Sequence, residues 1–79
     1  MKDVIMAVGV DKRSTAAATV QEILTKYGDM IHFRLGHHGE GEDNGRILLQ
    51  VIGDDARIDA MKAELSALDL VKVQAMELE

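Results

Sequence analysis

The stretch Ile47-Leu48-Leu49-Gln50-Val51-Ile52, residues 47–52, places apolar side chains on both faces of the strand that it predicts, because side chains alternate along a strand. A second stretch, Val4-Ile5-Met6-Ala7-Val8, has the same two-sided pattern near the start of the chain. Strands that are apolar on both faces belong in the middle of a sheet. We therefore expect strands over residues 3–10 and 46–52 to be central neighbours.

Two further predicted strands have one polar face, which is typical of the edges of a sheet. The first covers residues 29–35, where apolar side chains alternate with a polar set that includes His32 and Arg34. The second covers residues 71–76, where the polar set includes Lys72 and Gln74. This alternation predicts that His32 and Arg34 project from the open face of the sheet, near the connection that follows.

Two amphipathic helices are predicted between the strands, because apolar residues recur there at helical spacing. The stripe of the first consists of Ala17, Val20, Leu24 and Tyr27. The stripe of the second, which follows a turn at residues 53–55, consists of Ile58, Met61, Leu65 and Leu68. Asp11 or Ser14 is expected to cap the first helix.

The resulting element order is β-α-β-β-α-β, in a single domain over residues 1–79. The right-handed crossover rule favours the strand order 4-1-3-2 for this sequence of elements, with both helices on one face of an antiparallel sheet. That architecture is the α+β, ferredoxin-like class, and its first and third strands are central. The two-sided apolar pattern of residues 47–52 agrees with this assignment.

The open face of such a sheet carries apolar side chains that neither helix covers. Whichever face of the first strand packs on the helices, either Ile5 and Ala7 or Val4, Met6 and Val8 remain on the other face. Uncovered apolar patches mark interaction surfaces, and a chain of 79 residues has only a small core. The sequence therefore predicts self-association as a homodimer or homotetramer.

Composition argues against several classes of function. A formal net charge of −5 disfavours nucleic acid as a partner, and only Tyr27 and Phe33 offer an aromatic ring on which a base could stack. The chain has no cysteine, which excludes disulfides and thiolate metal sites. No stretch predicts a signal peptide or a membrane span, so we expect a cytoplasmic protein with no membrane partner.

Three segments of the chain carry a resemblance to a known family: Asp11-Lys12-Arg13, the run Ile23-Leu24-Thr25-Lys26-Tyr27-Gly28-Asp29-Met30-Ile31, and Arg34-Leu35-Gly36. They resemble a family of small ACT-like regulators of the iron-only hydrogenase system. That family is similar in turn to ACT domains and to the C-terminal domain of a nickel-responsive repressor. Those domains assemble as dimers or tetramers through their sheets and bind amino acids or metal at subunit interfaces. The resemblance implies a non-enzymatic regulatory module that binds a small effector at a subunit interface and modulates a partner system.

The first candidate ligand site is the connection between the first strand and the first helix. Asp11, Arg13 and Ser14 lie there, and the backbone N–H groups at the start of a helix attract a carboxylate or phosphate. The alternative is a helix start that is polar because it is exposed. ACT domains commonly have a glycine at this point, whereas this chain has Ser14 and Thr15.

The second candidate is Arg34 with Gly36. An arginine in an edge strand can hold a ligand carboxylate through two parallel hydrogen bonds. The alternative is that Arg34 pairs with an acidic residue such as Glu77 across a subunit interface.

The third candidate is a metal site formed by His32, His37 and His38, since imidazole binds divalent transition metals such as zinc, nickel or copper. His37 and His38 replace an apolar residue and a proline of many family members. The acidic residues that could complete the coordination are Glu40, Glu42 and Asp43. The alternative is a solvated loop, and no other cofactor is predicted. A histidine-based metal sensor and a purely structural oligomerisation domain therefore stand beside the regulatory hypothesis.

No catalytic arrangement is predicted. No serine has an obvious general base beside it, and there is no cysteine nucleophile. Acylphosphatase has a similar fold, but its arginine-bearing glycine loop and assisting asparagine have no counterpart here. We therefore expect no enzymatic activity.

Overall fold

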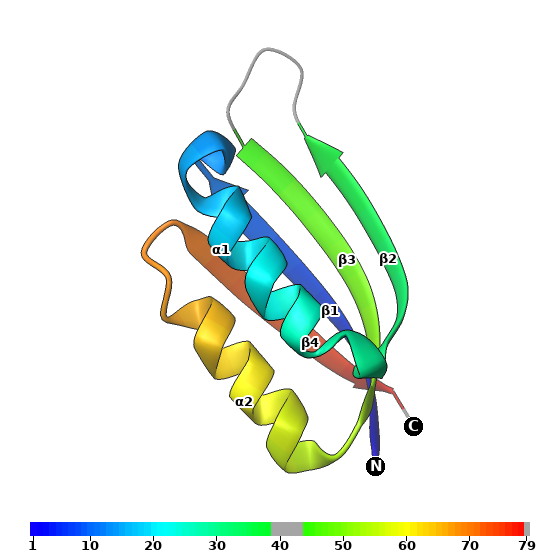
Figure 1. Ribbon diagram of the computed structural model, residues 1–79. Helices are drawn as coiled ribbons and strands as arrows, with labels where there is room; N and C mark the ends of the chain where they lie inside the picture. Colours follow the sequence, from blue (N-terminus) through cyan, green and yellow to red (C-terminus); the bar gives the residue numbers. More distant parts are fainter. Residues whose placement is uncertain (39–43, 79) are drawn as a thin grey trace.

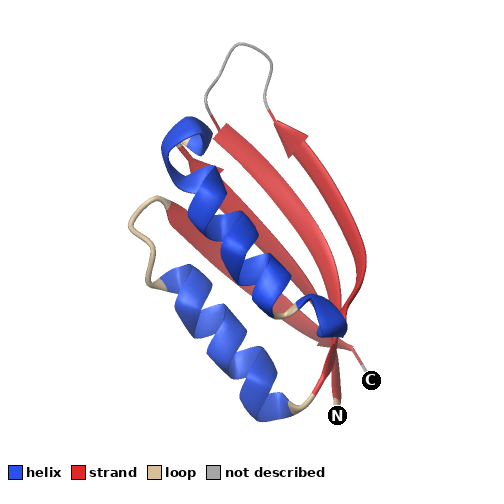
Figure 2. Ribbon diagram, in the orientation of Figure 1, coloured by secondary structure: helices blue, strands red, loops and turns tan. Residues whose placement is uncertain are grey.

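The computed structural model describes residues 1–38 and 44–78, and this description excludes the side chains of Arg13 and His38. Its elements follow the chain as β1 (Lys2–Asp11), α1 (Arg13–Lys26), η1 (Gly28–Met30), β2 (Ile31–His38), β3 (Asn44–Gly53), α2 (Asp55–Ser66) and β4 (Val71–Leu78). The strands form one sheet, and both α-helices lie across the same face of it (Figure 1). Figure 2 shows the resulting two layers, with the helices on one side only.

The strand order β2-β3-β1-β4 confirms the predicted 4-1-3-2 arrangement. β1 pairs with β3 along its whole length, from Lys2 opposite Gly53 to Asp11 opposite Asn44. On its other side β1 pairs with β4, and all the pairings are antiparallel. The two strands whose sequences are apolar on both faces are therefore the central pair.

The core lies between the helices and one face of the sheet. β1 contributes Val4, Met6, Val8 and Val10 to it, and β3 contributes Leu49 and Val51. The helices cover these side chains with the predicted stripes, of which Val20, Leu24, Ile58, Met61 and Leu65 are buried. Each fully buried side chain of this size contributes about 1.5–3 kcal/mol relative to an exposed one. Of the side chains that the structure describes, none of the buried ones is polar or charged.

A β-bulge in β2 reverses the predicted faces of this strand. The register shifts between Ile31, which lies opposite Val51, and Phe33, which lies opposite Gln50. Because β2 has one extra residue there, Ile31 packs against the core but Phe33 and Leu35 lie on the open face. The prediction that Arg34 projects from the open face is therefore wrong, since Arg34 lies opposite the buried Leu49 and on the helix side.

The two helices begin in different ways. α2 begins with a side-chain cap, in which the Asp54 carboxylate accepts a hydrogen bond from the backbone N–H of Ala56 at 3.4 Å. α1 has Lys12 at its N-cap, so the prediction of Asp11 or Ser14 there is wrong. Lys12 has a φ of 50°, the left-handed region in which a non-glycine residue is uncommon.

Among the residues described, no helix has the length and hydrophobicity needed to cross a bilayer.

A polar surface cluster, here called the helix clamp, joins the end of α1 and η1 to α2. The Tyr27 hydroxyl donates a hydrogen bond to Glu64, and Lys26 Nζ lies 2.9 Å from the same carboxylate. Arg57 donates two hydrogen bonds to the Asp29 carboxylate, at 2.6 and 2.9 Å. The cationic groups of Lys26 and Arg57 lie 5.3 and 5.7 Å from the centre of the Tyr27 ring. These contacts fix the position of α2 against the end of α1.

The helix clamp makes part of the stability dependent on pH. Hydrogen bonds from Tyr27 and Lys26 lower the pKa of Glu64, and the Arg57 guanidinium lowers the pKa of Asp29. A carboxyl group whose pKa is lower in the folded state stabilises the fold above its unfolded-state value, which is 4.5 for glutamate. That contribution disappears as the pH falls through the folded-state pKa.

We therefore expect the Glu64→Gln variant to be less stable than the wild type near pH 7, with the difference in unfolding free energy shrinking near pH 3. Chemical denaturation at both pH values measures this difference. Glu22→Gln is the matched control, because it removes an exposed carboxylate of α1 outside the helix clamp. A difference between wild type and Glu64→Gln that is the same at both pH values would contradict the prediction.

Candidate functional site

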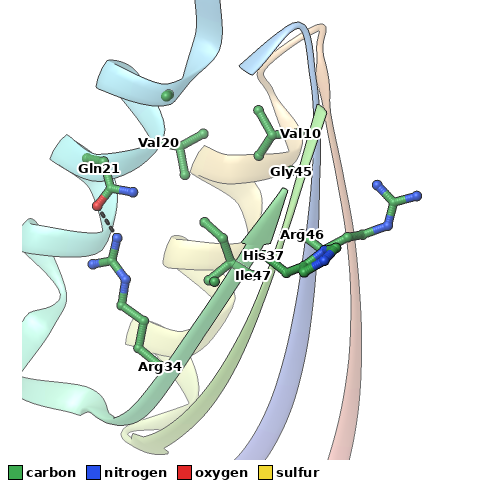
Figure 3. A pocket seen from close by; sticks show the side chains of 10 residues that line it. Val10, Val20, Gln21, Arg34, His37, Gly45, Arg46 and Ile47 are labelled. Atoms are coloured by element: carbon green, nitrogen blue, oxygen red, sulfur yellow. Dashed lines mark hydrogen bonds between the residues drawn. The ribbon is translucent and has the colours of Figure 1, made fainter. Parts of the chain in front are cut away.

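A pocket of about 170 Å³ lies between α1 and the ends of β2 and β3, on the helix side of the sheet (Figure 3). Most of its wall is apolar and comes from Val10, Ala17, Val20 and Ile47. Gly36 and Gly45 add bare backbone, because neither residue has a side chain to fill the space. The remaining lining residues are Gln21, Arg34, His37 and Arg46. We call this space the Arg34 pocket.

Arg34 supplies the charged group of the Arg34 pocket. Its side chain extends from β2 toward α1, where Nη2 donates a hydrogen bond to Oε1 of Gln21 (Figure 3). A guanidinium has five N–H donors, so this contact orients the group and leaves further donors for an anion. The bulge of β2 is the reason that this side chain reaches α1 rather than the open face.

His37 and Arg46 connect the Arg34 pocket to the other face of the sheet. The two residues lie opposite each other in β2 and β3. They line the pocket, yet the Arg46 side chain extends away from it (Figure 3). The ends of β2 and β3 therefore border both the Arg34 pocket and the open face.

The open face of the sheet carries a continuous group of apolar side chains. Apart from Met1, all the large hydrophobic side chains that the structure leaves exposed lie on this face, with exposed fractions from 36% to 60%. Together with their neighbours in β1 they form what we call the apolar band: Ile5, Ala7, Phe33, Leu35, Leu48, Met76 and Leu78. No helix covers this band (Figure 2).

A hollow of about 320 Å³ lies at one end of the open face. Gly9 lies opposite Arg46 in β3 and Lys72 in β4, so the missing side chain of the glycine leaves space between two cations. Asp11 lines the same hollow and partly offsets their charge. Among the described residues that line the hollow, the cations Arg46 and Lys72 outnumber this carboxylate, so the lining has a positive balance.

The structure separates the ligand residues predicted from the sequence. Arg34 and Gly36 lie together in the Arg34 pocket. Asp11 lies in the hollow on the other face of the sheet, and Ser14 is exposed in the first turn of α1. The side chain of Arg13 is outside the described residues, so its predicted role stays untested.

The predicted histidine site lies partly outside the described residues. His32 is exposed at the bulge of β2, and His37 lies farther along the strand, opposite Arg46. The side chain of His38 and residues 39–43, which include the predicted acidic ligands, lie outside the described residues. Within residues 1–37 and 44–78, no three histidines or carboxylates are grouped closely enough to hold a metal ion.

Several site residues had no distinctive signal in the sequence. Gln21 is a polar residue on the exposed side of an amphipathic helix, a position that usually has no role. Arg46 and Lys72 lie in strands that are recognised in the sequence by their apolar residues, so neither residue stands out as a candidate. Their placement on either side of Gly9 emerges only from the register of β1 with its two neighbours.

Comparisons with known proteins agree with this architecture. Residues 2–75 match the TM1266-like family, which is described as "Iron-only hydrogenase system regulator, putative". The chain is also similar to the solved structure of uncharacterized protein TM1266 from Thermotoga maritima, with 26% sequence identity and a TM-score of 0.92. That alignment covers 99% of this chain and 98% of the other. No curated protein matched the chain.

Proposed function

Because this chain belongs to the TM1266-like family of iron-only hydrogenase system regulators, we propose that it is a non-enzymatic regulatory module of that system. In this proposal the chain self-associates through the open face of its sheet. A small effector binds in the Arg34 pocket, next to that interface, and changes the assembly or its contact with a partner protein.

The observation that carries the proposal is the uncovered apolar band. A monomer rarely leaves so many large apolar side chains in contact with water on one face. The core of a 79-residue chain is also small, so burial of this band adds stability that the single domain lacks. Each square ångström of apolar surface removed from water contributes about 25 cal/mol.

The charges on the open face favour a second copy of the chain as the occupant. The hollow end, with Arg46 and Lys72, has a positive balance. Asp3 lies at the opposite end of β1, where its carboxylate accepts hydrogen bonds from Gln50 at 3.2 and 3.4 Å. A two-fold axis that reverses the strand direction places the hollow end of each copy over Asp3 of the other. The opposite charges then meet while the apolar bands pack at the centre.

The same geometry supports a link between effector and assembly. His37 and Arg46 line the Arg34 pocket and belong to the strand ends that border the open face. A ligand that moves these strand ends changes the surface that the second copy contacts. The effector then has different affinities for the free and the assembled chain, which is the requirement for allosteric coupling.

Native mass spectrometry tests the proposal directly. The chain is measured alone and with a panel of amino acids, other small carboxylates, nucleotides and divalent metal ions. We expect dimers or tetramers whose distribution shifts with one class of compound. A chain that stays monomeric and binds no member of the panel would contradict the proposed function.

A further inference from the structure

The volume of the Arg34 pocket suits a small molecule. Its volume of about 170 Å³ is close to that of an engineered protein cavity of about 150 Å³ that binds benzene. A pocket of this size holds about six to eight non-hydrogen atoms. Nucleotides and peptides are too large to fit within it.

The lining of the Arg34 pocket combines the Arg34 guanidinium with an apolar wall, and the side chain of its other arginine, Arg46, extends away from the space (Figure 3). Arg34 lies on the side nearest Gln21, and the wall beyond it comes from Val10, Val20 and Ile47 (Figure 3). A ligand that satisfies both parts has an anionic group at one end and a short hydrocarbon body at the other. A carboxylate is the anion that fits best, because its two oxygens match the paired N–H groups of a guanidinium.

None of the described residues that line the Arg34 pocket carries a carboxylate. A free amino acid brings an ammonium group, and in this pocket that group lies near the Arg34 guanidinium with no acidic partner among the lining residues. The two like charges repel, and none of the described lining residues carries a negative charge that would offset them. A carboxylic acid that has the same hydrocarbon body but no ammonium group avoids this cost.

We propose that the Arg34 pocket binds a short-chain monocarboxylate, with four to six carbons and no amino group, through the Arg34 guanidinium and the apolar wall. This inference rests on the proposed function, since it names the effector class for the same pocket. Gln21 acts as a positioning residue, because its side-chain oxygen accepts the hydrogen bond that holds the guanidinium toward α1.

Four probes with related carbon skeletons separate the contributions to binding. 4-Methylpentanoate has both the carboxylate and the branched body, L-leucine adds an ammonium group, 4-methyl-1-pentanol lacks the charge, and acetate lacks the body. Titrations of the full chain are followed by isothermal calorimetry and by amide NMR shifts at Gly36 and Gly45. We expect 4-methylpentanoate to bind at least tenfold more tightly than each of the other three probes.

Two variants test the two halves of the pocket. Arg34→Leu removes the cation, and Ala17→Leu fills space at the apolar wall; each is expected to weaken 4-methylpentanoate binding at least tenfold. Lys62→Leu is the matched control, because it removes an exposed cation of α2 outside the pocket and should leave binding unchanged. Equal binding of L-leucine, or unchanged binding by Arg34→Leu, overturns the inference.

Analytical ultracentrifugation of the same samples separates this inference from the proposed function. A chain that assembles but binds no 4-methylpentanoate overturns the monocarboxylate site and leaves self-association intact. A chain that binds 4-methylpentanoate through Arg34 but stays monomeric supports the site and contradicts the proposed mode of regulation.

Discussion

Replacing Leu48 by glutamate is expected to give a folded monomer in place of the proposed assembly. Leu48 lies in the middle of the apolar band, between Leu35 of β2 and Ala7 of β1, and 41% of its surface is exposed in the single chain. A carboxylate at this point would lose its hydration among the apolar side chains of the proposed interface. The dissociation constant should rise by at least about a hundredfold, which corresponds to about 2.7 kcal/mol.

Sedimentation velocity over a range of protein concentrations measures this change, and circular dichroism checks that the variant is folded. Ala60→Glu is the matched control, because it adds the same charge at an exposed position of α2, away from the open face. The control should assemble like the wild type. If Leu48→Glu assembles as tightly as the wild type, the apolar band is not the interface.

Replacing Leu49 by alanine is expected to cause a large loss of folding stability, whereas the change at Leu48 affects assembly. Leu49 is the next residue of β3, and its side chain points to the helix side, where none of its surface is exposed. Truncation of a fully buried leucine removes packing and leaves a cavity, which costs about 2–5 kcal/mol. For a small domain with a total stability of about 5–10 kcal/mol, this loss is a large share.

Leu48→Ala is the control for this experiment, since it deletes the same atoms from the neighbouring residue on the other face. Denaturant unfolding of both variants should be compared at low protein concentration, so that assembly does not add to the measured stability. We expect the Leu49→Ala transition to move to much lower denaturant and the Leu48→Ala transition to move little. Equal losses in the two variants would mean that the open face is packed in the single chain.

The strand order was predictable because two independent properties of the sequence lead to it. The order of helices and strands restricts the topology, and the two-sided apolar pattern of residues 47–52 identifies a central strand. The faces of β2 were not predictable in the same way. Apolar and polar residues alternate regularly along its sequence, and the bulge after Ile31 is seen only when β2 is paired with β3. A perfect alternation therefore gave the wrong face for Arg34.

The Arg34 pocket was predictable only in part. Arg34 and Gly36 were candidates because their chemistry suits a carboxylate, and the structure does place them in one pocket. Gln21 lies in α1, 13 positions before Arg34 in the chain, and no spacing rule connects the two residues. The left-handed backbone of Lys12 was not predictable either, because glycine usually occupies such a position and this chain has a lysine there.

The bulge in β2 makes the two surfaces of this domain dependent on one another in evolution. Regular pairing of β2 without the bulge, with the sequence unchanged, would move Arg34 to the open face and turn Phe33 toward α1, since side chains alternate along a strand. A charged group would then enter the apolar band while the pocket lost its cation. A relative that lacks the extra residue keeps Arg34 on the helix side in a regular strand, whereas a relative that has this residue must also keep the bulge.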